Sequence, residues 1–200
     1  MPSFREKTPS RTCTETYLRY RSYKKYLVID FFNRCGYCNG SDTWYGGYKS
    51  FHIDHFAPSD QFPQRETAYT NLIYSCPFCN NAKSNKWPSN DPDINIVGTT
   101  GFLNPVTDDL NVNFERDDMG NIVGLTDIAR DMIVNLNLNL ERHSVIWMLS
   151  KLEFLIQNYE DALNKRGLTT RVKRKLSDIH YNLLQVFFEY YLRLKELNIL

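Results

Sequence analysis

The sequence CPFCNNAK at residues 76–83 contains a Cys-x-x-Cys motif, and the sequence CGYC at residues 35–38 contains another. Each motif can place two thiolates on one side of a tight turn, so the pair supplies four soft ligands for tetrahedral zinc at about 2.3 Å. A redox motif or two buried cysteine clusters are the alternatives, but two motifs together favour a structural Zn²⁺ site. The fifth cysteine, Cys13, is left over as an ordinary cysteine. The predicted zinc ligands are Cys35, Cys38, Cys76 and Cys79.

The stretch FHIDHF, residues 51–56, lies inside the loop that such a metal site would close. Binding of the ion would hold the enclosed residues in place, because it ties the two ends of the loop together. On a strand, His52 shares a face with Asp54, two residues away. His52 is therefore a candidate to ligate a metal, to hydrogen-bond Asp54 or to contact substrate. The alternative is a partly exposed strand histidine.

The chain has 200 residues, of which 42% are hydrophobic and 14% aromatic, enough for one packed domain or a compact domain with an appendage. No stretch approaches the ~20 apolar residues that span a bilayer, and the N-terminus lacks the apolar segment of a secretion signal. We therefore expect a cytoplasmic protein without membrane contact, in which cysteines serve metal binding more than disulfides.

The formal net charge of +1 conceals an uneven distribution. Residues 1–34 carry eight Lys or Arg and three Asp or Glu, whereas residues 100–131 carry two basic and seven acidic side chains. The basic segment can lie along phosphates, although an ordinary solvated face is the alternative. Four tyrosines interleave with these cations at a spacing of three, which favours packing against the core over stacking on nucleic acid. They are Tyr17, Tyr20, Tyr23 and Tyr26.

Apolar periodicity predicts an α+β fold that is mostly helical, with a first helix over residues 15–34. Strands are expected over residues 48–56 and 72–76, and a short helix over residues 77–87. Residues 88–113 are expected to be irregular. The core candidates in the first helix are Leu18, Leu27, Val28, Phe31 and Phe32.

Farther along, FERDDMGNIVGL at residues 114–125 predicts a β-hairpin, and Thr126 is the expected N-cap of a helix through Leu136. Two long helices then close the chain, with Gly167 between them, which predicts an antiparallel helical hairpin. Their expected buried stripes are Val145, Leu149, Leu152, Ile156, Tyr159 and Leu163, and Val172, Leu176, Ile179, Leu183, Val186 and Tyr190.

The remaining two histidines, His143 and His180, fall in the long helices, with no cysteine or carboxylate cluster at ligand spacing. We expect them to be surface or packing residues.

The sequence predicts a division of the chain into two parts. Residues 1–98 contain the first helix and the cysteine motifs, and residues 99–200 contain the acidic hairpin and the C-terminal helices.

The order of polar residues around the cysteine motifs is specific. Asp54-His55 precedes Asn71, and Asn80 directly follows the last cysteine, with Lys83 three positions on. Over residues 35–87 this order resembles the HNH nuclease family, whose fold is the ββα-metal motif. The resemblance implies an HNH nuclease core with a structural zinc ion, to which the C-terminal helical hairpin is added.

The resemblance also implies roles for these residues. His55 would be the general base, Asp54 and Asn80 would hold a catalytic Mg²⁺ or Mn²⁺, and Asn71 would orient His55 by hydrogen bonding. The residue types suit phosphodiester cleavage, because a neutral imidazole takes a proton from water near pH 7 and a hard ion prefers oxygen ligands. Lys83 is a candidate phosphate contact, and a solvated helix lysine is the alternative.

The region after the nuclease core is similar to the corresponding region of bacterial anti-phage HNH effectors, including the small nuclease subunit of Septu systems and retron-associated nucleases. That likeness implies an ABC-type ATPase as a protein partner. Such effectors often carry Glu-His where this chain has Asp54-His55, but either carboxylate can ligate a metal. The similar pieces are Phe102–Pro105, Asp108-Asp109, Phe114, Gly120, Leu125-Thr126 and Leu136-Asn137.

The leading hypothesis is therefore a metal-dependent endonuclease that cleaves DNA, works with an ATPase partner and serves anti-phage defence. The alternative is a non-catalytic, zinc-bound module that binds nucleic acid or acts as an adaptor. Such a module has no need of Asp54, His55 and Asn80 together. The apolar sequence FFEYYLRL, residues 187–194, offers a docking surface in either case, unless it is buried within the molecule.

Overall fold

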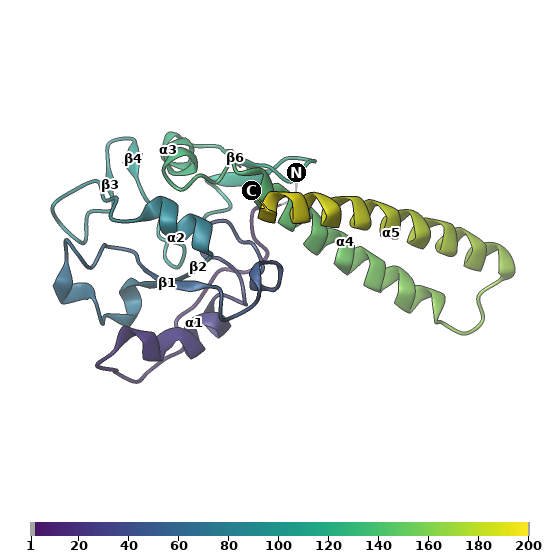
Figure 1. The fold of residues 1–200 in the computed structure, drawn as a ribbon, viewed down its shortest axis with the longest axis horizontal. Coiled ribbons are helices and arrows are strands. Elements are labelled where there is room, and N and C mark those ends of the chain that lie inside the picture. The colour runs from purple at the N-terminus through teal and green to yellow at the C-terminus, as the bar shows by residue number, and fades with distance from the viewer. Residues whose placement is uncertain (1–2, 200) are drawn as a thin grey trace. The chain divides into compact units, whose positions relative to one another are not determined.

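A two-stranded antiparallel sheet carries the HIDH sequence. β1 (His52–His55) pairs with β2 (Leu72–Ser75), and α2 (Pro77–Lys83) follows β2 directly (Figure 1). β2 is buried along its whole length, whereas β1 has one buried residue, two half-buried residues and one exposed residue, His52. The register sets His55 opposite Leu72 and Asp54 opposite Ile73, so the polar pair lies at the end of a strand whose partner is apolar.

The computed structural model describes residues 3–199, and the chain divides into two compact units between His143 and Ser144. The predicted division after residue 98 does not coincide with this one. The physical reason is that residues 99–143 share one buried core with the sheet and the cysteine motifs. They contribute Phe102, Leu103, Leu110, Phe114, Ile122, Ala129, Met132, Leu136 and Leu138 to it.

The first helix is shorter than the predicted span of residues 15–34. A 3₁₀ turn, η1 (Tyr20–Tyr23), leads into α1 (Lys24–Asp30), and the residues before it are not helical. The Tyr17 amide donates to the Tyr23 hydroxyl, and this hydrogen bond holds the residues just before η1 in a non-helical conformation. Leu18 is therefore 97% exposed, contrary to its prediction as a core residue, while Leu27 is fully buried as expected.

The C-terminus of α1 also differs from the predicted continuous helix. Phe32 and Asn33 have left-handed backbones with φ of 54° and 58°, and the Asn33 amide donates to the carbonyl of Val28. This cap ends the helix four residues before Cys35 and leaves Phe32 39% exposed. The chain can then turn into the first cysteine motif.

The segment after α2 is more ordered than its composition predicts. β3 (Ile96–Val97) pairs with β4 (Thr100–Gly101), where irregular structure was expected. Gly101 has φ of 137°, and a Cβ there would lie 2.2 Å from the carbonyl oxygen of Asn95, so the close pairing requires glycine. Three further 3₁₀ turns are η2 (Asp42–Tyr45), η3 (Pro63–Arg65) and η4 (Tyr69–Asn71).

The predicted hairpin and helix of residues 114–136 are confirmed. β5 (Phe114–Arg116) pairs with β6 (Ile122–Gly124), and α3 (Asp127–Asn135) follows. Thr126 caps α3, since its side chain accepts a hydrogen bond from the amide of Ala129. The fold of the first unit is thus a mixture of helices and small antiparallel sheets, in agreement with the mixed class predicted from the sequence.

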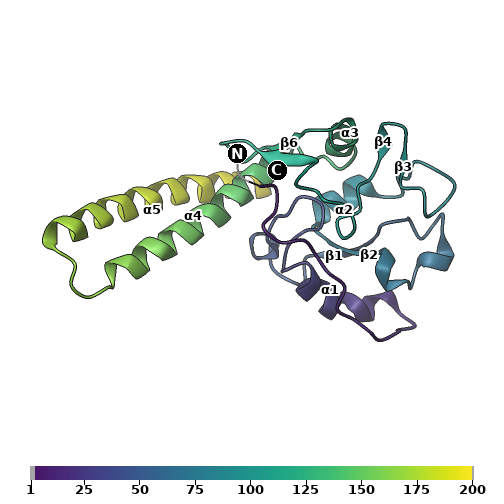
Figure 2. The same cartoon turned by 180° about the vertical axis from the view of Figure 1, so that it is seen from behind.

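The second unit is built by α4 (Glu141–Leu163) and α5 (Thr170–Ile199), with Gly167 at φ of 84° in the connection. Figures 1 and 2 both show the two helices side by side, running in opposite directions. Among the described residues, none of the helices combines the length and apolarity needed to cross a bilayer.

The inward stripe of α5 differs in part from the predicted one. Leu176, Leu183 and Tyr190 are half-buried as expected, but Val172 is 43% exposed, Ile179 42% and Val186 38%. Next to Ile179 and Val186, the less exposed residues are His180 and Phe187, one position further along. The alternating spacing of three and four residues alone did not show which of two neighbouring residues lies on the buried face of the helix.

Candidate active site and metal centre

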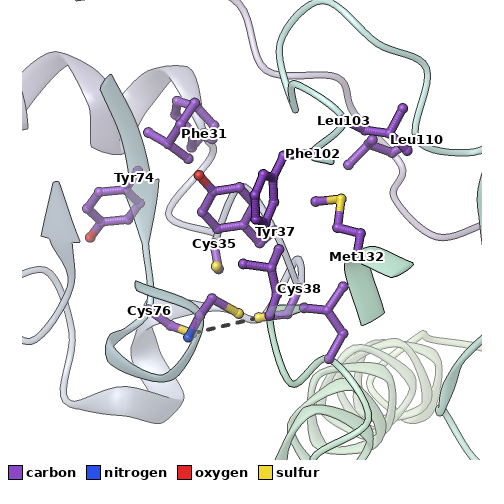
Figure 3. Close-up of a cluster of buried hydrophobic side chains, with 14 of the residues drawn as sticks. Phe31, Cys35, Tyr37, Cys38, Tyr74, Cys76, Phe102, Leu103, Leu110 and Met132 are labelled. Carbon is purple, nitrogen blue, oxygen red and sulfur yellow. Dashed lines mark hydrogen bonds between the residues drawn. The ribbon is translucent and has the colours of Figure 1, made fainter. Parts of the chain in front are cut away.

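The four cysteines of the two motifs come together in the core of the first unit. All four are buried, their sulfur atoms lie within 4.8 Å of one another, and the sulfurs of Cys38 and Cys76 are 3.9 Å apart. Ligands at 2.3 Å around a tetrahedral zinc ion are separated by about 3.8 Å. The donor set and its spacing therefore fit structural zinc, as the sequence predicts. Figure 3 shows Cys35, Cys38 and Cys76 among the aromatic and aliphatic side chains of the core.

Local backbone geometry explains how each motif presents its thiols. Cys76 is the N-cap of α2, and its sulfur accepts from the amide of Cys79 at 3.4 Å. In the first motif, a Cβ on Gly36 would lie 2.6 Å from the side chain of Ile73, so only glycine allows the turn to pack on β2. Burial raises the pKa of the Cys79 thiol well above its ordinary value, so a thiolate at this position would need a charge partner such as a bound cation.

His143 lies beside this cluster and is one of the residues that sequence reasoning missed. It is 1% exposed, and its Nε2 atom is 4.0 Å from the sulfur of Cys79. The Tyr45 hydroxyl is 3.3 Å from its Nδ1 atom. His143 is thus buried beside a metal-ligand set, not the surface residue that the sequence left open. No ligand spacing reveals it, since 64 positions separate it from Cys79.

Two buried guanidinium groups also contact the first cysteine motif. Arg5 donates to the carbonyl of Gly36 at 2.7 Å, and Arg116 donates to the carbonyl of Cys38 at 2.7 Å. Burial lowers the pKa of both guanidinium groups to about 10, and the nearby cysteines act in the opposite direction. A zinc ion with four thiolates has two net negative charges. Two buried cations beside it therefore offset that charge.

His55 lies at the end of β1, and its ring is held on two sides. Its Nε2 atom is 2.9 Å from the carbonyl oxygen of Glu66, and the ring of Tyr20 packs edge-on at a centroid distance of 4.8 Å. A carbonyl can only accept, so Nε2 carries the proton in this contact. The lone pair of the neutral ring is then on Nδ1, and the imidazole is set to accept a proton there.

Asp54 is buried beside His55 and shares one oxygen with two partners. Its Oδ2 atom accepts from the Tyr37 hydroxyl and lies 3.6 Å from the ammonium of Lys83. Burial raises the pKa of Asp54, while Lys83 and then Tyr37 counteract that rise. No described residue forms a hydrogen bond with Oδ1, so this oxygen remains for a ligand. Tyr37 lies within the CGYC motif, which connects the cysteine cluster directly to the carboxylate.

Lys83 is fully buried, so it is not the solvated helix lysine that the sequence left as an alternative. Its ammonium donates to the carbonyl of His55 at 3.0 Å and faces Asp54. Burial lowers the pKa of Lys83, and Asp54 partly restores it. These contacts make Lys83 a partner of the Asp54-His55 pair. Contact with a phosphate stays a prediction.

Asn71 does not form the direct hydrogen bond to His55 that the resemblance implied. Its side-chain oxygen accepts from the amide of Ala57 at 2.8 Å, and its amide donates to the carbonyls of Ala57 and Arg65. The loop that it fastens also carries Glu66, whose carbonyl holds His55. Asn71 and His55 are thus both hydrogen-bonded to the backbone of this loop.

Asn80 and His52 lie together at the exposed side of the site. The amide nitrogen of Asn80 is 3.1 Å from Nδ1 of His52. Of the three roles left open for His52, the hydrogen bond to Asp54 is not formed; its partner among the described residues is Asn80. If this amide donates, its carbonyl oxygen stays free to meet a cation.

An open pocket of about 190 Å³ is lined by the polar groups of this site. Asp54, His55 and Asn80 all line it, together with Ser59 and Ser84. The pocket offers a carboxylate, an amide and an imidazole to one ligand. An oxygen-rich divalent cation site with a neighbouring proton acceptor therefore fits these walls.

Comparison with known protein families gives a match over the segment that carries this site. The model of the HNH endonuclease family matches residues 35–86, from the first cysteine of the cluster to just beyond Lys83. Comparisons with curated proteins and with solved structures gave no match. The matched residues include all four cysteines, Asp54, His55 and Asn80. Residues 35–86 thus match an HNH endonuclease domain that has a cysteine cluster suited to structural zinc.

Proposed function

We propose that residues 35–86 form a metal-dependent endonuclease that hydrolyses DNA phosphodiester bonds. The observation that carries this proposal is the shared pocket of Asp54, His55 and Asn80 within the segment that matches the HNH endonuclease family. A carboxylate, an amide and a neutral imidazole are the groups that metal-assisted hydrolysis of a phosphodiester requires.

His55 is the general base in this proposal. Its Nε2 proton is engaged by the carbonyl of Glu66, so Nδ1 takes the proton from an attacking water. The new oxygen–phosphorus bond forms as the bond to the leaving oxygen breaks, and that oxygen gains a proton from solvent. Tyr20 and the loop fastened by Asn71 keep the ring from rotating away from this position.

Asp54 and Asn80 would hold the catalytic Mg²⁺ or Mn²⁺. The free Oδ1 atom of Asp54 and the carbonyl oxygen of Asn80 are hard donors, which suit these ions. Such an ion would neutralise charge on the scissile phosphate and stabilise the leaving oxygen. Lys83 and Tyr37 contact the other oxygen of Asp54 and favour its ionised form against the effect of burial.

The decisive experiment is a cleavage assay on linear and supercoiled DNA with Mg²⁺ or Mn²⁺. The wild type is expected to nick or cut, and His55→Ala to lose on the order of 10²–10⁴-fold in rate while it retains its zinc. His180→Gln is the matched control, because it removes a histidine from the second unit and should cut like the wild type. A His55→Ala protein that cuts at the wild-type rate would exclude His55 as the base.

We also propose that the nuclease is an effector of anti-phage defence that works with an ABC-type ATPase. The likeness of residues 102–137 to such effectors motivates this proposal. The second unit supports a protein partner, since it exposes Phe154, Tyr181 and Phe188, each by more than half of its surface. Co-purification with an ATPase encoded beside this chain is the test, and the absence of any complex would remove the proposal.

One observation favours the alternative of a non-catalytic zinc module. Asp54 is buried and already paired with Lys83 and Tyr37, as in a purely structural ion pair. Isothermal titration with Mn²⁺ separates the two functions. The nuclease requires binding that is lost in Asp54→Asn and in Asn80→Ala, whereas a structural pair predicts no binding in the wild type either.

A further inference from the structure

The connection between α4 and α5 carries an unusual concentration of positive charge. Six of the twelve residues 164–175 are Lys or Arg, and none is acidic. The whole chain has a net charge of only +1, so this segment, here called the hairpin tip, departs strongly from the rest. The six cations are Lys165, Arg166, Arg171, Lys173, Arg174 and Lys175.

All six cations of the hairpin tip are exposed. Within residues 3–199, none of their side chains forms an ion pair or a hydrogen bond. Other arginines of the chain do pair with carboxylates, as the half-buried Arg65 does with Asp93 and the exposed Arg130 does with Asp127. The flanking carboxylates are Glu160, Asp161 and Asp178, and none of them forms an ion pair with a cation of the tip among the described residues. The hairpin tip is therefore a patch of uncompensated charge.

The placement of these cations is unfavourable for the helix that carries them. Arg171 and Lys173 lie in the first turn of α5, where the helix dipole is positive and no acidic residue is present. Arg171 and Lys175 are four residues apart, a spacing that brings like charges together on one face. Folding alone would select carboxylates at this end of a helix. An anionic ligand would remove the repulsion.

The composition of the hairpin tip indicates which anion it suits. No Phe, Tyr or Trp occurs between Tyr159 and Tyr181, so the tip has no platform on which unpaired bases could stack. Its only apolar side chains are Leu168 and Val172, too few for insertion into a bilayer interface. Lysines and arginines without aromatic or apolar neighbours match the regular phosphates of a duplex.

We propose that the hairpin tip is a second nucleic-acid site, which grips the phosphate backbone of duplex DNA outside the pocket of Asp54 and His55. This inference rests on the proposed function for the identity of the ligand. The contacts are electrostatic and independent of base sequence, because contacts to phosphates carry no sequence information. The tip thus raises affinity for DNA without setting where it is cut.

Binding of a short labelled duplex to the full-length His55→Ala protein tests the proposal, with the salt concentration varied. The variant Arg171→Gln, Lys173→Gln, Arg174→Gln should weaken binding at low salt by on the order of tenfold or more. The slope of log affinity against log salt should shrink by about 0.9 for each lost phosphate contact. Lys195→Gln removes a cation near the other end of α5 and is the control for loss of charge outside the tip; it should leave the slope unchanged.

A second measurement separates binding from structure. Removal of cations from the first turn of α5 should leave the thermal midpoint unchanged or raise it, whereas a structural role for them predicts a fall. An unchanged slope and affinity for the triple variant would overturn the proposal. Tip-dependent binding to anionic phosphatidylserine vesicles, without tip-dependent binding to duplex, would overturn it as well.

The two proposals fail separately. If the wild type cuts DNA and the tip variant binds it normally, the hairpin tip has no DNA role and the nuclease stands. If the wild type never cuts and the tip variant still loses duplex affinity, the tip site stands and the catalytic proposal is lost.

Discussion

The segment of residues 35–86 and the helical hairpin of the second unit use charge in opposite ways. In the first, charged groups such as Asp54 and Lys83 are buried, and each has a named partner. In the second, the six cations of the hairpin tip are exposed and form no ion pair among the described residues, and the helices are held by an apolar stripe that leaves large side chains uncovered. Buried charges must be paired to be tolerated, whereas exposed ones are free to meet a ligand. Substitutions should therefore mainly affect stability in the first region and binding in the second.

The largest expected effect follows from removing one zinc ligand. Cys76→Ser should abolish stoichiometric zinc binding and unfold the first unit, because a structural site contributes its metal-binding free energy to folding. The helical signal of α5 should persist, since its stripe does not depend on the cysteine cluster. Zinc content and hydrogen exchange measure both outcomes. Cys13→Ser is the control and should change neither, and equal loss of protection in α5 would contradict the independence of the two regions.

The second-largest expected effect follows from breaking the buried pair of Asp54 and Lys83. Lys83→Met leaves Asp54 buried without its cation, which should cost about 3–5 kcal/mol in the free energy of unfolding. Lys49→Met, at an exposed and unpaired lysine, should cost less than about 0.5 kcal/mol. Adding Asp54→Asn to Lys83→Met should restore part of the loss, because no charge is then left unpaired. Denaturant titration of the variants checks these values.

The pH dependence of the same variant has a definite sign. Burial already raises the pKa of Asp54, and the loss of Lys83 removes the charge that counteracts this rise. A carboxyl whose folded pKa lies above its unfolded value favours folding when protonated. The deficit of Lys83→Met should therefore be largest above the folded pKa of Asp54 and shrink as the pH falls through it. A deficit that grows in acid would contradict this account of the pair.

A smaller effect is expected at the margin of the zinc site. His143→Phe removes the imidazole beside Cys79 and should weaken zinc retention by roughly 10-fold, as for other partners of metal ligands. The rate of zinc transfer to a chelator measures it without reference to catalysis. His180→Phe is the matched control. Equal rates in the wild type and His143→Phe would show that the contact is only packing.

The sequence predicted the site better where a motif specifies chemistry than where a contact crosses the fold. The cysteine quartet and the Asp54-His55 order were readable because ligand spacing is local along the chain. Tyr37, Tyr20 and His143 were not, since each reaches the site through packing between distant segments. In the helical hairpin the difficulty was different. Periodicity located both helices but assigned Ile179 to the buried face of α5, whereas packing between the helices decides which face is buried.

The smallest expected effect tests that reassignment of the face of α5. Ile179→Ala should change the free energy of unfolding by less than about 0.5 kcal/mol, because the side chain is 42% exposed. Leu183→Ala, at a half-buried position of the same helix, should cost clearly more, since it removes apolar contacts from the stripe. If the two variants are equally destabilising, Ile179 is covered in solution. The face of α5 that carries Ile179 would then be buried in solution, as the charged pair of the first region is. A protein bound to this face would be the physical reason.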